Sequence, residues 1–134
     1  MENLQKDFLP FELALRMKQL GFDEPCFAKY ITSDLIVKGC YKDSHIIHAL
    51  FEENEICEAH ILVPTFSQAF RWFREKHNLD SRFHTYTHHK DGNRTDYMHD
   101  FIDGKKTSFD GFEKTYGEAE QACLVKLIDI VKNK

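Results

Sequence analysis

The stretch SRFHTYTHHKDGNRTDYMHDFIDGKKTSFDGFE, residues 81–113, decides the fold because it holds three Asp-Gly pairs between strand-like runs. Asp and Gly accept the positive φ angles of a tight turn, so such pairs are strong hairpin signals. The three pairs are Asp91-Gly92, Asp103-Gly104 and Asp110-Gly111. We therefore predict a three-stranded antiparallel meander with strands at 81–90, 93–102 and 105–109.

The chain ahead of this meander predicts a helix that ends near His77. Thr65 followed by Gln68 forms a capping-box pattern at its start. Trp72 falls at the edge of the apolar face, so we expect it either to cap the core or to meet a partner. The predicted buried face consists of Phe66, Ala69, Phe70 and Phe73.

A second predicted helix follows the meander and runs to about Lys132. Thr115 and Glu118 repeat the capping-box pattern at its start. Its apolar face is broad, as expected for a helix that lies across a sheet. That face comprises Ala119, Cys123, Leu124, Leu127, Ile128, Ile130 and Val131.

The N-terminal half predicts one more helix and further strands. The helix spans about Leu9 to Leu20, and Gly21 supplies the left-handed residue that commonly ends a helix. Residues 26–37 predict a hairpin of two short strands, and residues 61–63 predict a strand that Pro64 stops. Residues 39–56 are compatible with either a short helix or a buried strand.

This order of elements favours the α+β class, with an antiparallel sheet (hairpin plus three-stranded meander) packed against three helices. A length of 134 residues and 42% hydrophobic residues suit one domain, residues 1–134, with one sizeable core. The net charge of -4 argues against a nucleic-acid partner.

Cysteine usage and hydropathy predict a cytoplasmic protein. The four cysteines form no C-x-x-C pair, which favours reduced, buried thiols over a disulfide framework. No signal peptide and no apolar run of membrane-spanning length is recognisable, so we expect no membrane partner.

Three helical blocks resemble a set of small proteins from Bacteroidota, their phages and mobile elements. The blocks are KQLGFDEPCFAKY at 18–30, PTFSQAFRWFREKHNL at 64–79 and YGEAEQACLVKLIDIVK at 116–132. The resemblance implies a phage or mobile-element context, and it implies no catalytic residues. Residues 38–60 and 81–113 lie outside it, so a specific function is expected there.

The meander concentrates histidine and tyrosine, and its register predicts which of them meet. If Asp91-Gly92 is a two-residue turn, His84 faces His99 and Tyr86 faces Tyr97. The face so formed comprises His84, Tyr86, His88, Tyr97, His99 and Phe101.

Two functions follow from that predicted face. As a ligand surface it would offer Tyr86, Tyr97, His84 and His99, with Arg82 and Arg94 beside them to meet an anion. As a metal site it would let His84 and His99 share one zinc ion, with His60 or His77 as a third ligand. No zinc-enzyme motif supports the second reading, and the opposite arrangement, in which helices cover this face as core, stays open.

We therefore predict a non-enzymatic binding protein without a cofactor or metal. Its expected partner is a small molecule, a nucleotide-like molecule or a host protein, and it would inhibit a host factor or sequester a signal. The alternatives are a metal-dependent hydrolase using the meander histidines, and a structural or homo-oligomerising module for which Trp72 is the only indication.

Overall fold

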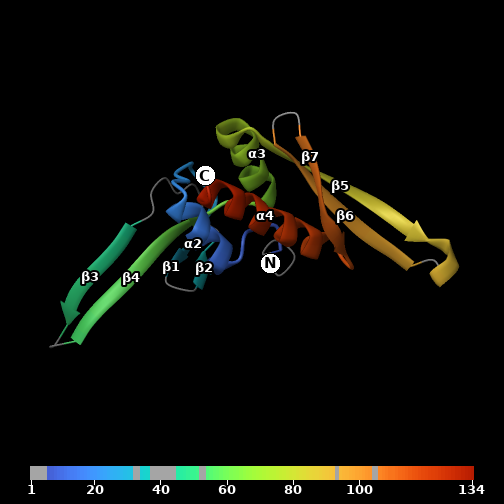
Figure 1. Ribbon diagram of the computed structural model, residues 1–134. Coiled ribbons are helices and arrows are strands. Elements are labelled where there is room, and N and C mark those ends of the chain that lie inside the picture. The colour runs from blue at the N-terminus through green and yellow to red at the C-terminus, as the bar shows by residue number, and fades with distance from the viewer. Residues whose placement is uncertain (1–5, 32–33, 37–44, 52–53, 93, 104–105) are drawn as a thin grey trace. The chain divides into compact units, whose positions relative to one another are not determined.

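The computed structural model describes residues 6–31, 34–36, 45–51, 54–92, 94–103 and 106–134 (Figure 1). The chain divides into two compact units, Met1–Phe66 and Ser67–Lys134. Helices and antiparallel strands occur in both, which confirms the predicted α+β class. The hairpin and the meander, however, belong to two separate sheets and not to one.

The first unit begins with helix α2, Phe11–Gln19, which ends at the predicted glycine. Gly21 has a φ of 99°. Its N–H donates to the Lys18 carbonyl at 3.0 Å, and the Phe22 N–H donates to the Met17 carbonyl at 3.0 Å. These two bonds form the Schellman motif, in which a left-handed residue lets the chain satisfy the last carbonyls of the helix.

The sheet of the first unit has the strand order β2-β1-β4-β3 and is antiparallel throughout. Its strands are β1 (Ala28–Ile31), β2 (Asp34–Ile36), β3 (His45–Phe51) and β4 (Asn54–Val63). The pair β1–β2 confirms the predicted hairpin. Strand β3 settles the ambiguous stretch in favour of a strand, while residues 37–44 lie outside the described residues.

Buried hydrogen bonds tie the start of the chain to this sheet. The Tyr30 hydroxyl donates to the Leu9 carbonyl at 3.0 Å, and the Leu9 N–H donates to the Pro64 carbonyl at 3.1 Å. Burial raises the pKa of the Tyr30 hydroxyl, because the low-dielectric surroundings disfavour a phenolate. The Phe11 ring meets the Tyr30 ring edge-on at 5.4 Å, which packs α2 on the sheet.

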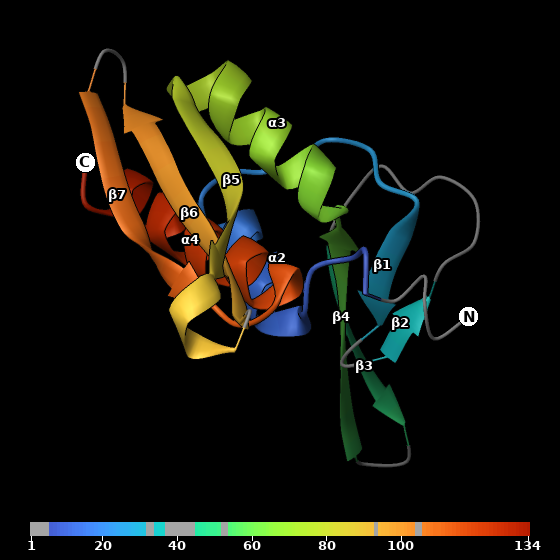
Figure 2. The ribbon, with the colours of Figure 1, turned by 90° about the vertical axis from the view of Figure 1, so that its right-hand side faces the viewer.

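The second unit contains two helices and the meander (Figure 2). Helix α3 is Phe66–His77 and helix α4 is Tyr116–Lys132, as predicted. The Thr115 hydroxyl accepts a hydrogen bond from the Glu118 N–H at 3.1 Å. This is one of the two bonds of the predicted capping box, and it confirms Thr115 as the N-cap. The buried residues of α4 are Ala119, Cys123, Leu124, Leu127 and Ile128.

The meander consists of β5 (Leu79–His88), β6 (Arg94–Asp103) and β7 (Lys106–Glu113), in the order β5-β6-β7. The predicted turn at Asp110-Gly111 is wrong, because both residues lie inside β7. His99 pairs with Gly111 and Asp100 pairs with Phe109, so Asp110 is the extra residue of a β-bulge. The bulge absorbs the residue and lets β7 continue to Glu113.

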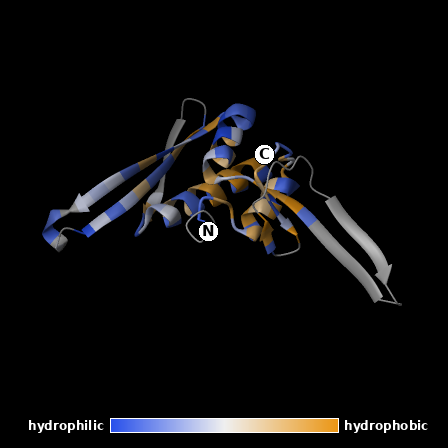
Figure 3. Cartoon of the chain, turned by 180° about the vertical axis from the view of Figure 1, so that it is seen from behind, coloured by the Kyte–Doolittle hydropathy of each residue, from blue (hydrophilic) through white to orange (hydrophobic). Residues whose placement is uncertain are grey.

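Within this unit, hydrophobic and hydrophilic residues lie on different elements. Figure 3 shows hydrophobic residues along α4, whereas the ends of β5 and β6 next to the 3-10 turn His89–Asp91 are hydrophilic. Cys123 is a buried free thiol in α4, and Cys26 is another in the first unit. In the part of the chain that the structure describes, no helix is long and apolar enough to cross a bilayer.

Replacing Gly21 with alanine tests the helix ending. Alanine strongly disfavours positive φ, so we expect Gly21→Ala to lower the free energy of unfolding by about 1 kcal/mol or more. The measurement is urea unfolding followed by circular dichroism. Gly117→Ala is the matched control, since a Cβ there meets no atom within 4 Å and alanine favours the helix. Equal losses in both variants would contradict the role given to Gly21.

Candidate functional site

The register of β5 and β6 differs by one residue from the predicted one. His84 pairs with Met98, and His99 pairs with Phe83. A two-residue type I′ turn needs positive φ at both central residues. Here Asp91 instead ends a 3-10 turn and Gly92 has a φ of 71°, so the connection between His88 and Arg94 is longer than a two-residue turn.

This shift of one residue separates the predicted histidine and tyrosine cluster. Side chains alternate between the two faces of a sheet, so a one-residue slip moves one strand's set to the other side. His84 and Tyr86 lie on one face, while Tyr97 and His99 lie on the opposite face. The predicted common face is therefore wrong. His88 belongs to β5, but its side chain lies outside the described residues.

The face that carries Tyr97 and His99 is covered by the helices. The Tyr116 ring of α4 lies 5.4 Å from the Phe83 ring and 6.0 Å from the Tyr97 ring. The Phe70 ring of α3 lies 5.4 Å from Phe83. His99 is 2% exposed, with its Nε2 3.4 Å from Glu113 Oε1. The expectation that helices cover the cluster thus holds for this half of it.

His84 and Tyr86, the other half of the predicted cluster, are exposed. We name their side of the sheet the open face. It consists of Arg82, His84, Tyr86, Asp96, Met98 and Phe112. Tyr86 is 54% exposed and Phe112 is 47% exposed. Their ring centroids are 6.3 Å apart at an interplanar angle of 62°. Two large aromatic side chains thus lie together at the surface, and exposed apolar side chains that cluster in this way are a feature of interaction sites.

Phe112 lies outside the site that the sequence predicts. The predicted third strand ends at residue 109 because Asp110-Gly111 has the composition of a turn. Through the bulge at Asp110, Phe112 pairs with Met98 and reaches the open face. The signal in the sequence was the alternation that resumes after Gly111, with Phe112 and Glu113 directed to opposite faces.

The two arginines predicted to meet an anion are each paired with a carboxylate of the same sheet. Arg82 donates to both oxygens of Asp100, at 3.0 Å from Nε and 2.9 Å from Nη2. Hydrogen bonding to the Asp100 side chain raises the pKa of Arg82, and the charge of that carboxylate adds to the effect. Arg94 Nη2 lies 3.4 Å from Asp96 Oδ2.

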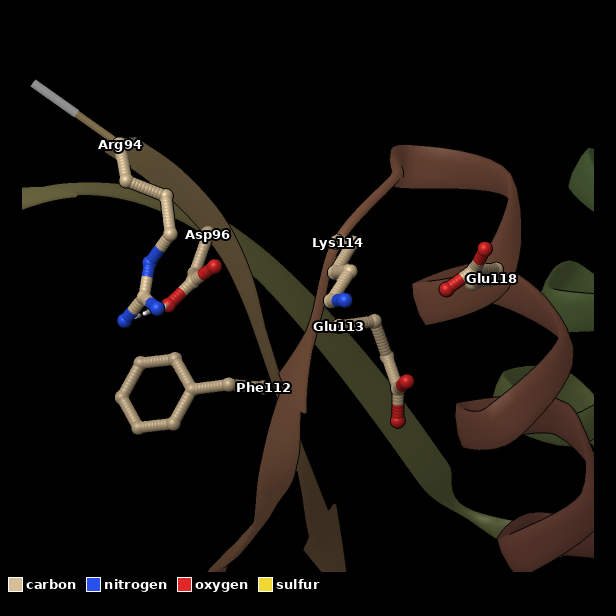
Figure 4. A pocket seen from close by; sticks show the side chains of 6 residues that line it. All are labelled: Arg94, Asp96, Phe112, Glu113, Lys114 and Glu118. Atoms are coloured by element: carbon tan, nitrogen blue, oxygen red, sulfur yellow. Dashed lines mark ion pairs between the residues drawn. The ribbon is translucent and has the colours of Figure 1, made fainter.

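A hollow of about 490 Å³ adjoins the open face at the edge of β7 (Figure 4). It is lined by Arg94, Asp96, Phe112, Glu113, Lys114 and Glu118. Asp96 and Phe112 belong to the open face, Arg94 is the ion-pair partner of Asp96, and Glu118 comes from the first turn of α4. The hollow therefore extends the exposed aromatic surface with charged groups of both signs.

The geometry removes the premise of the zinc prediction. His84 and His99 lie on opposite faces of the sheet, so they cannot bind one ion. His60 Nδ1 lies 3.2 Å from Lys29 Nζ in the first unit. Over the described residues, no group of three or more His, Cys, Asp or Glu side chains is placed to hold a metal ion.

Trp72 is part of the core and not of the surface. It is 4% exposed, and its ring meets Phe73 at 5.0 Å and His77 at 4.7 Å. Of the two predicted roles, capping the core is therefore the one observed. The predicted homo-oligomerising module had no other indication than an exposed Trp72, so the burial of Trp72 leaves that alternative without support.

Stability should depend on pH through His77. Burial lowers its pKa below the ordinary 6.5, and the positive charge of Lys134 lowers it further. The unfolded chain binds more protons below pH 6.5, so stability should fall as the pH drops from about 6.5 toward the lowered value. Urea unfolding between pH 7.5 and 5.5 measures this, and His77→Gln should show a smaller loss. Lys134→Gln should also weaken the dependence; a wild-type protein that gains stability as pH falls would contradict it.

The Arg82–Asp100 pair offers a second test. The Asp100 side chain is 8% exposed, so Arg82→Gln leaves a buried carboxylate without its guanidinium and should lower the urea midpoint. The double variant Arg82→Gln/Asp100→Asn removes both charges and should recover part of the loss. Arg71→Gln, an exposed position on α3, is the control and should leave the midpoint unchanged. A double variant less stable than the single one would contradict this account.

The chain matches no protein-family model, no curated protein and no solved structure. The phage and mobile-element context stays a prediction based on the helical blocks at 18–30, 64–79 and 116–132.

Proposed function

We propose that this chain is a non-catalytic binding protein that recognises a protein partner through the open face. The observation that carries this proposal is the exposed Tyr86–Phe112 pair on the side of the sheet opposite to α3 and α4. Tyr, Phe, Met and Arg are the residue types enriched at the buried centre of protein interfaces. All four types are present on the open face.

The shape of the face favours a protein over a small molecule. Small-molecule sites are concave and enclose most of the ligand. Tyr86 and Phe112 are instead exposed on a sheet surface, and of the two only Phe112 lines the adjoining hollow. A nucleotide-like ligand is also disfavoured, because the stacking surface expected for it required Tyr86 and Tyr97 on one face, and they lie on opposite faces.

The proposed partner is a host protein, and the proposed compartment is the cytoplasm. The host assignment rests on the resemblance of the helical blocks to phage and mobile-element proteins. The compartment is supported by Cys26 and Cys123, which are buried free thiols of the kind that a reducing environment maintains. Binding would inhibit or sequester the partner.

Peptide display against the whole chain tests the proposal. We expect selected peptides to bind the wild type and to lose at least about tenfold in affinity to Tyr86→Ala and to Phe112→Ala, as truncated interface centres do. Fluorescence anisotropy on synthetic copies of the peptides measures the loss.

Phe27→Ala supplies the matched control for this experiment. Phe27 is an aromatic residue that is 66% exposed in the other unit, outside the open face. Its removal should leave the affinity unchanged. Selected peptides that depend on Phe27 and not on Tyr86 or Phe112 would contradict the proposed site.

A further inference from the structure

Strand β5 is an edge of the meander sheet, because β6 is the one described strand that pairs with it. An edge strand presents backbone N–H and C=O groups that can pair with a further strand. The other edge, β7, is interrupted by the bulge at Asp110, whereas β5 pairs with β6 without a register shift along its ten residues. The regular edge of this sheet is therefore β5.

The sequence of β5, LDSRFHTYTH, lacks the features that usually protect an edge. It contains no proline, glycine or lysine, and its formally charged residues, Asp80 and Arg82, lie near its start. The residues that follow are mostly aromatic or β-branched, which are the types that favour a strand. From His84 to Thr87 every side chain is exposed, so neither face of the strand is covered there. This part of the edge is accessible to a further strand.

The same part of the meander has only two described strands. Strand β7 pairs with β6 from Tyr97 to Asp103, so Arg94–Asp96 of β6 continue beyond it with β5 alongside. Figure 1 shows β5 and β6 extending past β7 at this end. Two strands without a third, or without a helix against them, are only marginally stable in water. Pairing along β5 would supply a third strand there.

We infer that β5 pairs with β5 of a second copy of the chain, antiparallel and across a two-fold axis at His84. In such a pair each residue faces the one equally far from His84 on the other copy, so Arg82 faces Tyr86 and Phe83 faces Thr85. The start of β5 belongs to the three-stranded part of its own sheet and would lie beside the two-stranded end of the other copy. Each copy would thus supply the third strand that the other needs.

The geometry of a strand and the side chains of β5 select this register. The outward-facing backbone groups of an edge strand belong to alternate residues, so a strand that pairs with itself must centre on a residue. Centred on Phe83, the pair would set Arg82 against His84, which have the same sign when the imidazole is protonated. Centred on Thr85, it would take Arg82 away from Tyr86. Only the pair centred on His84 sets Arg82 against the Tyr86 ring, once on each side of the axis.

Arg82 and Tyr86 are complementary in this arrangement. The Arg82 guanidinium donates from Nε and Nη2 to Asp100 at 3.0 and 2.9 Å, so its charge is already compensated within the chain. Stacking of its planar face on an aromatic ring requires no further N–H group. The Arg82 side chain is 45% exposed and Tyr86 is 54% exposed. Two such contacts would cover the Tyr86 rings of both copies.

A strand of a different protein is the competing occupant, because backbone pairing by itself carries little sequence preference. The charges of β5 favour self-pairing. The strand has one acidic and one basic residue, Asp80 and Arg82, so two copies meet without a net formal charge at the edge. Trp72, which is buried, takes no part in this association.

Charge substitutions at His84 test both the association and its register. The wild type, 15.8 kDa as a monomer, should show a mass that rises toward twice this value with concentration. His84 would face itself across the axis, so His84→Glu and His84→Lys each oppose like charges and should raise the dimer dissociation constant at least about tenfold. An equimolar mixture of the two variants should recover most of the loss, because the mixed dimer opposes unlike charges. Sedimentation equilibrium of the full chain measures the constants.

Two controls limit the effect to the edge of β5. Gln121→Glu and Gln121→Lys place the same charges at an exposed position of α4 and should leave the dissociation constant unchanged, alone and mixed. Phe112→Ala alters the open face on β7 and should leave the constant within about twofold, although the proposed function expects it to lose peptide affinity. Circular dichroism checks that each variant is folded.

The outcomes separate this inference from the proposed function. A wild type that stays monomeric up to about 1 mM would overturn the inference. If that monomer binds the selected peptides and His84→Lys weakens them, the edge belongs to a strand of another protein. A mixture no tighter than either His84 variant alone would overturn the two-fold pairing at His84. The expected dimer, in a protein whose peptide binding depends on neither Tyr86 nor Phe112, would support the inference and contradict the proposed function.

Discussion

The pairing register of β5 and β6 is the constraint on which the surface of the second unit depends. Because side chains alternate along a strand, one residue of register decides whether a whole set of side chains is covered or exposed. The observed pairing of Phe83 with His99 directs both toward α3 and α4, and it leaves Tyr86 exposed. The Arg82–Asp100 bond joins the same two strands across the open face.

Local sequence signals predict the ends of the helices correctly, but they do not predict the pairing register of β5 and β6. Gly21 ended α2 as predicted, and Thr115 began α4 with the expected bond to the Glu118 N–H, because caps involve residues within one turn of each other. The β5–β6 register depends on the whole connection between His88 and Arg94, in which Asp91 completes a 3-10 turn. The Asp-Gly signal located this connection correctly but gave the wrong length for it.

The candidate site was predictable only in part for the same reason. His84, Tyr86, Arg82 and Arg94 are on or beside the open face, and their role in binding stays a prediction. The predicted register wrongly places Tyr97 and His99 on this face. The predicted turn at Asp110-Gly111 leaves Phe112 out of it, because an Asp-Gly pair can form a bulge as well as a turn. The choice between a bulge and a turn depends on pairing with the neighbouring strand β6. A local sequence pattern carries no information about that pairing.

The burial of Trp72 gives the molecule an optical probe of one unit. It is the single tryptophan of the chain, it lies in α3 with its ring against Phe73 and His77, and it belongs to the unit Ser67–Lys134. Its fluorescence therefore reports the unfolding of that unit, whereas far-ultraviolet dichroism averages over both. A comparison of the two signals resolves the cooperativity between the units without any label.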